Sequence, residues 1–99
     1  MNHQEHFDKE AFQNVLKQYE QARRSGEDIY LDADVLTDIA DYYDHHHQTK
    51  KAIETIDYAI RLFPGSVFPL VFRARMAMMI EDDLEAAKRY LSNVDDKNC

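Results

Sequence analysis

Residues 33–66 read ADVLTDIADYYDHHHQTKKAIETIDYAIRLFPGS, and the spacing of the apolar residues in this stretch decides the fold. Before the three histidines, apolar side chains recur every three or four positions, at Val35, Leu36, Ile39, Ala40 and Tyr43. After them the same spacing continues at Ala52, Ile53, Ile56, Ala59, Ile60 and Phe63. This period places each set on one face of a helix. Pro64-Gly65-Ser66 ends the second helix, so the stretch predicts two antiparallel helices joined by a short turn.

Further helices are predicted on both sides of this pair. A leading helix over residues 6–22 ends at Ser25-Gly26, and its apolar residues are Phe7, Ala11, Phe12, Val15, Leu16, Tyr19 and Ala22. A fourth helix covers residues 67–80, with Pro69 in its first turn, where proline is tolerated. A fifth begins after Asp82 or Asp83, and its apolar stripe is Leu84, Ala87, Tyr90, Leu91 and Val94. With two Gly and two Pro and no convincing strand, the chain is predicted to be all-α, with about five antiparallel helices.

The helix pair has a recognisable pattern. It contains Leu36-x2-Ile39-Ala40-x2-Tyr43, then Ala52-x3-Ile56-x2-Ala59, then Pro64. This resembles the tetratricopeptide repeat, whose pattern over about 34 residues is W-x2-L-G-x2-Y, then A-x3-F, then P. Small residues in such a pattern stand where two helices cross closely. The resemblance implies a right-handed stack of helical hairpins and a role in binding other proteins.

The residues that follow match this pattern less closely. Leu70, Ala74, Ala77, Ala86 and Tyr90 fall in register, whereas Arg73 stands where the family has an aliphatic residue. We prefer a register with one extra residue in the loop at Glu81-Asp82, because it makes Ala87 the packing alanine with Leu91 as its partner and buries Leu84. The expected organisation is a single helical repeat domain over 1–99. It consists of a leading helix (1–25), a first repeat (33–66) and a second repeat (67–95).

The three histidines, His45 to His47, are interpreted as the turn between the paired helices. The family has glycine at the position of His47, where the backbone φ is often positive, and histidine tolerates that conformation better than most residues. A metal site needs three or four converging ligands, and adjacent residues at a helix end point in different directions. Adventitious binding of nickel or zinc stays open.

The predicted partner-binding surface has an acidic half and an apolar half. Seven acidic residues and no Lys or Arg lie in residues 27–44. In the family, the first helix of each pair lines a concave groove, which here would present Asp34, Thr37, Asp38, Asp41, Asp44 and His45. The second repeat would present Phe68, Val71, Phe72, Arg75, Met78 and Met79, and methionine adapts its shape to varied partners. The plainer readings are a solvated acidic helix face and packing between helices.

Composition limits the classes of function. The net charge of −7 disfavours nucleic acid and anionic membranes, because both are bound by basic patches. One cysteine, Cys99, allows no internal disulfide, and no apolar run approaches the roughly 20 residues that span a bilayer. We expect a soluble, cytoplasmic protein. No phosphate-binding loop, zinc-protease motif or activated nucleophile is present, so neither catalysis nor a cofactor is expected.

The sequence therefore favours a scaffold that binds an unidentified protein or peptide partner. Two alternatives stay open. One is a divalent-metal-binding helical protein that uses Asp41, Asp44 and the histidines. The other is the N-terminal structural segment of a longer repeat array, or a module that forms a homodimer through its last helix, because Leu84, Tyr90, Leu91 and Val94 offer more apolar surface than one inward face needs.

Overall fold

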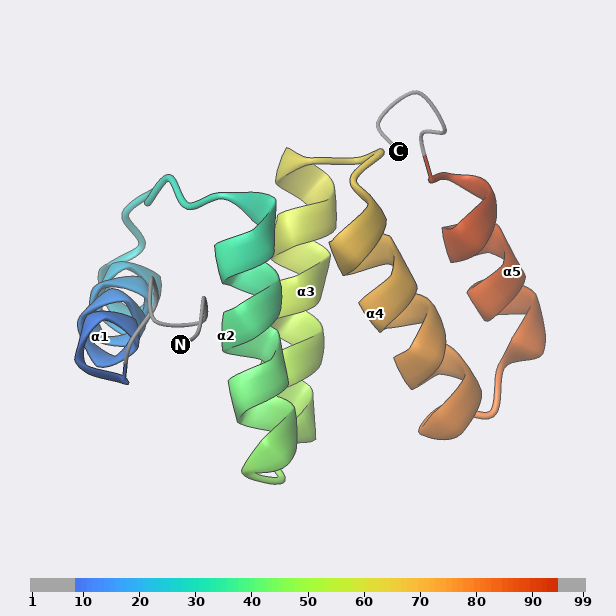
Figure 1. The fold of residues 1–99 in the computed structure, drawn as a ribbon, viewed down its shortest axis with the longest axis horizontal. Helices are drawn as coiled ribbons and strands as arrows, with labels where there is room; N and C mark the ends of the chain where they lie inside the picture. Colours follow the sequence, from blue (N-terminus) through green and yellow to red (C-terminus); the bar gives the residue numbers. More distant parts are fainter. Residues whose placement is uncertain (1–8, 95–99) are drawn as a thin grey trace, which may run out of the picture. The chain divides into compact units, whose positions relative to one another are not determined.

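The computed structural model describes residues 9–94, and within this range all regular structure is helical (Figure 1). The five helices are α1 (Lys9–Ser25), α2 (Ala33–His45), α3 (Thr49–Leu62), α4 (Val67–Met79) and α5 (Leu84–Ser92). The chain divides into two compact units, Met1–Tyr30 and Leu31–Cys99. The prediction of an all-α protein is confirmed, whereas the right-handed tetratricopeptide-like stacking stays a prediction.

The described part of the first unit is α1, whose buried residues are Leu16, Tyr19 and Ala22 on one face. Arg23 and Arg24 occupy the last turn, where cations are favourable to the helix dipole. The helix ends at Gly26, which has a φ of 76°, a conformation that glycine adopts without steric cost. The expected start of this helix at residues 6–8 and the residues His3, His6 and Cys99 lie outside the described range. The expectation that α1 covers the first helix pair stays a prediction.

The second unit consists of two helical hairpins, α2 with α3 and α4 with α5, and α4 lies against both helices of the first hairpin (Figure 1). The core is built from the apolar positions of the predicted stripes. Among its fully buried side chains are Leu36, Ile39, Ala40, Ala52, Ile56, Ala59 and Leu70. The alanines let the helix axes approach closely, and the larger residues fill the space between them. Ile53, Ile60 and Phe63, which we expected to be buried, are half-buried.

The loop between α4 and α5 is one residue longer than the loop between α2 and α3. Among residues 9–94, two non-glycine residues have a positive φ, His47 at 60° and Asp82 at 53°, and each lies in the turn of its hairpin. Ala52 and Ala87, five residues beyond each of these, are both buried. The side chain of Asp83 accepts a hydrogen bond from the Ala86 amide at 2.9 Å and caps α5. The longer loop and the buried Ala87 agree with the preferred register, which stays a prediction.

The reason given for that register is wrong. Leu84 is 56% exposed and Leu91, the expected partner of Ala87, is 47% exposed. Ala77 and Ala87 occupy the crossing between α4 and α5, with Ala74, Ala86 and the half-buried ring of Tyr90 beside them. Both leucines are exposed, because no further described helix of the second unit covers that side of the second hairpin.

Candidate functional site: a pocket between α2 and α4

A pocket of about 480 Å³ lies between the last turns of α2 and α4. Its lining is Asp41, Asp44 and His45 from α2, Arg75, Met76 and Met79 from α4, and Ile80 directly after α4. Five of these, Asp41, Asp44, His45, Arg75 and Met79, belong to the predicted partner-binding surface. The structure therefore brings part of the acidic half and part of the apolar half together at one place.

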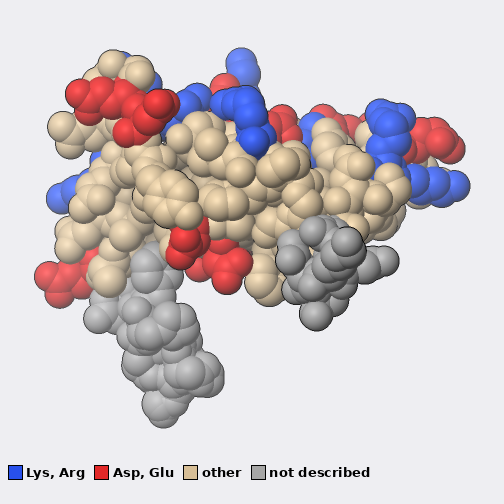
Figure 2. Space-filling model, turned by 90° about the horizontal axis from the view of Figure 1, so that it is seen from above, with Lys and Arg blue, Asp and Glu red and all other residues tan. Residues whose placement is uncertain are grey.

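The α2 wall of the pocket is acidic. Asp41 and Asp44 are half-buried one turn apart, and α2 has no Lys or Arg. Figure 2 shows a group of acidic side chains in the middle of the lower part of the view, with no described Lys or Arg side chain beside it. The imidazole Nδ1 of His45 lies 2.9 Å from the Asp41 carbonyl oxygen and 3.4 Å from the Asp41 carboxylate. The hydrogen bond to that carbonyl and the negative charge of Asp41 raise the pKa of His45 above 6.5.

The α4 wall is apolar apart from one cation. Met79 and Ile80 are exposed at the rim, and Met76 is buried at the base. The Arg75 guanidinium lies 4.8 Å from the centre of the Phe72 ring, which is within cation–π range. Phe72 itself is 5% exposed, so the expectation that it lines the open surface is wrong, and its ring belongs to the core. Met76 was not predicted to line the partner-binding surface. It is buried beside Ala77, and nothing in its spacing distinguishes it from a core residue.

The other predicted surface residues lie outside this pocket. Asp34 and Asp38 are exposed further towards the start of α2. Thr37 is half-buried and its hydroxyl donates to the Ala33 carbonyl at 2.8 Å, inside its own helix. Phe68, Val71 and Met78 are exposed along α4. The predicted surface is therefore split between a pocket and a separate exposed side of α4.

The histidine turn has the expected backbone. His47 takes the positive φ, as predicted from the glycine that the family has there. The Nδ1 atoms of His45 and His46 lie within 2.9 Å of the carbonyls of Asp41 and Tyr42, one turn back. The His46 ring also lies 4.2 Å from the ring of Tyr42, centre to centre. These two imidazoles add a side-chain hydrogen bond to carbonyls in the last turn of α2, and the Tyr42 carbonyl also accepts from the His46 amide at 3.1 Å.

The metal alternative gains no support from this geometry. Within residues 9–94, no group of three or more His, Cys, Asp or Glu side chains is arranged to hold a metal ion. The Nδ1 atoms of His45 and His46 lie at hydrogen-bonding distance from carbonyls of α2. These two rings therefore lie along α2 and do not converge on a common metal position.

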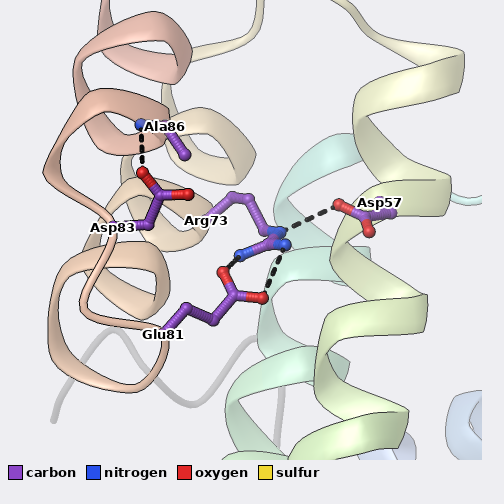
Figure 3. Close-up of polar contacts among 5 residues, drawn as sticks. All are labelled: Asp57, Arg73, Glu81, Asp83 and Ala86. Carbon is purple, nitrogen blue, oxygen red and sulfur yellow. Dashed lines mark hydrogen bonds and ion pairs between the residues drawn. The ribbon is translucent and has the colours of Figure 1, made fainter.

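A buried arginine joins the two hairpins (Figure 3). Arg73 on α4 is 7% exposed, and its Nε donates to the Asp57 carboxylate on α3 at 3.1 Å. The other two guanidinium nitrogens donate to the two oxygens of Glu81 at 2.7 and 3.3 Å. Its guanidinium also lies 5.1 Å from the ring centre of Tyr90 on α5. Burial lowers the pKa of Arg73, but the hydrogen bond to Glu81 and the charge of Asp57 outweigh this effect and raise it.

The departure of Arg73 from the family pattern was visible in the sequence, but its partners were not. Asp57 and Glu81 belong to different elements, and only the packing of α4 on α3 brings them to one guanidinium.

Comparisons of the chain with protein-family models, curated proteins and solved structures found no match. Among the described residues, no helix is long and apolar enough to cross a membrane.

Proposed function

We propose that this chain is a protein–protein interaction module that binds a segment of a partner protein in the pocket between α2 and α4, with no chemistry of its own. The observation that carries the proposal is the composition of the pocket. An acidic wall faces an apolar wall across about 480 Å³, a volume within the range of ligand-binding clefts. The resemblance of residues 33–66 to a repeat that binds peptides supports the same function.

The pocket fits a peptide that carries a basic side chain next to an apolar one. Asp41 and Asp44 offer carboxylates to a Lys or Arg, and such charge-assisted hydrogen bonds are stronger than neutral ones. Met79 and Ile80 offer apolar surface that adapts to its ligand. The negative net charge of the chain favours the approach of a basic peptide and opposes nucleic acid.

Titration of the isotope-labelled protein with two short probe peptides tests this function. One peptide contains Arg next to Leu, and the other has Glu in place of Arg. We expect the Arg peptide to shift the amide signals of Asp44, His45, Met79 and Ile80. Asp44→Asn and Met79→Ser should each weaken its binding by about fivefold. Asp38→Asn serves as the matched control, because Asp38 lies on α2 outside the pocket. Shifts confined to other residues, or equal effects of the Asp38 and Asp44 variants, would refute the proposal.

A further inference from the structure

The two hairpins of the second unit present corresponding faces. The face of the first hairpin consists of Thr37, Asp41 and Asp44 on α2 and Thr49, Ile53 and Ile56 on α3. Allowing for the extra loop residue, the same positions in the second hairpin are Val71, Arg75 and Met78 on α4 and Leu84, Lys88 and Leu91 on α5. We call these last six residues the end face.

One of these faces is covered and the other is open. α4 lies against α2 and α3, and its Arg73 reaches Asp57 beside the first face. All six residues of the first face are buried or half-buried, whereas all six residues of the end face are exposed. The clearest pair is Ile56, which is fully buried, and Leu91, which is 47% exposed. The end face therefore has the two-helix arrangement on which a helix packs in the first hairpin, but no described helix of the second unit occupies it.

The two faces differ in charge. Asp41 and Asp44 are the charged groups of the first face, whereas Arg75 and Lys88 are those of the end face, which contains no acid. Among residues 9–94, neither Arg75 nor Lys88 forms an ion pair. The four other residues of the end face are apolar, and Lys88 lies between Leu84 and Leu91 on the surface of α5. The end face thus combines exposed apolar area with two cations that form no ion pair within residues 9–94.

We infer that the end face binds an amphipathic helix of another protein that carries carboxylates beside its apolar residues. A helix fits because two antiparallel helices form the groove that a third helix occupies on the first hairpin. Carboxylates fit because they pair with Arg75 and Lys88. A second copy joined through the same face is disfavoured, because it would bring the cations of both copies into one interface. This binding surface is distinct from the pocket, apart from Arg75 at the border of both.

Two labelled synthetic helices of about 15 residues test the inference, one built from Leu and Glu and the other from Leu and Lys. The net charge of −7 attracts the Lys helix without specificity, so a preference for the Glu helix is a stringent result. We expect fluorescence polarisation to show that the Glu helix binds at least about tenfold more tightly than the Lys helix. We also expect amide shifts at Val71, Met78, Leu84 and Leu91.

Variants locate the effect. Leu91→Asp should abolish binding of the Glu helix, and Lys88→Glu should weaken it. Both side chains are exposed, and circular dichroism checks that each variant stays folded. Asp38→Asn, on α2 outside both the pocket and the end face, should leave binding of the Glu helix unchanged. Binding of neither helix, a preference of the end face for the Lys helix, shifts by the Glu helix that are confined to residues away from the end face, or a self-association that Leu91→Asp disrupts would each overturn the inference. Shifts by the Lys helix at Asp44 and Met79 report on the pocket instead.

Discussion

At the scale of single residues, Arg73 shows how one charged side chain can connect elements that are far apart in the sequence. Its guanidinium is buried but all three of its nitrogens are hydrogen-bonded to carboxylates that remain partly in water. A buried charge is tolerated only with such partners. Because Asp57 and Glu81 remain partly hydrated, the free-energy cost of desolvating the ion pairs is lowered. The cluster therefore holds the loop before α5 and the side of α3 against α4.

We expect Arg73→Ala to lower the free energy of unfolding by about 2–3 kcal/mol, because it removes charge-assisted hydrogen bonds and leaves a gap between α3, α4 and α5. Arg73→Met, which keeps much of the volume, should cost less than Arg73→Ala. Urea denaturation followed by circular dichroism measures both. A loss below about 0.5 kcal/mol for the alanine variant would show that the cluster contributes only what an exposed ion pair does.

The second prediction at this scale concerns His45. Its pKa in the folded protein lies above 6.5, so the folded state favours the protonated imidazole. The resulting stabilisation is complete below pH 6.5 and is lost as the pH rises through the folded pKa. An NMR titration of the His45 ring protons should give a midpoint above 6.5. Asp41→Asn should lower this midpoint only partly, because the hydrogen bond to the Asp41 carbonyl remains. A midpoint at or below 6.5, or no response to the Asn substitution, would contradict this assignment.

At the scale of helices and their connections, the two turns carry the conformational strain of the second unit. His47 and Asp82 both adopt the left-handed region. This conformation is unfavourable for a residue that has a Cβ atom, but not for glycine. His46, immediately before His47, has a φ of −100° and uses its side chain on the Tyr42 carbonyl. Replacement by glycine should therefore have opposite effects at His47 and at His46.

We expect His47→Gly to stabilise the protein by up to about 1 kcal/mol, because glycine adopts a positive φ without a steric penalty. His46→Gly is the matched control and should destabilise it by about 1 kcal/mol, because it removes the hydrogen bond and the contact with Tyr42 and adds chain entropy to the unfolded state. Thermal melting of the two variants side by side measures the difference. Equal melting temperatures would mean that the turn is not fixed in this conformation in solution.

The crossing of α2 and α3 makes a second prediction at this scale. Ala52 is fully buried, so Ala52→Leu should overpack the crossing and cost roughly 1–3 kcal/mol. Glu54→Leu places the same side chain at an exposed position of α3 and should change stability by less than about 0.5 kcal/mol. Chemical denaturation distinguishes the two variants. An Ala52→Leu protein as stable as the wild type would show that the crossing is looser than the close approach described above.

At the scale of the whole molecule, periodicity predicted the helices and their ends, because Gly26 and Pro64-Gly65 interrupt an otherwise regular apolar pattern. Periodicity identifies which residues share a face but not what covers that face. For this reason Leu84 and Leu91 were expected inside and lie outside. The pocket was predicted only in part, since Asp44 and Met79 meet through the packing of α4 on α2 and not through any spacing in the chain.

The division into two units leads to a last prediction. The second unit, Leu31–Cys99, contains fully buried Leu36, Ile39, Ile56 and Leu70, and it also contains the whole Arg73 cluster. A fragment of residues 31–99 should therefore fold alone, with helical circular dichroism and one cooperative thermal transition, although so short a chain buries a core of modest stability. Arg73→Ala in this fragment should then lower stability by about the same 2–3 kcal/mol as in the full chain, because the described partners of Arg73, which are Asp57, Glu81 and Tyr90, all lie within the fragment. A broad, non-cooperative transition of the unsubstituted fragment would show that residues 1–30 are needed to complete this core.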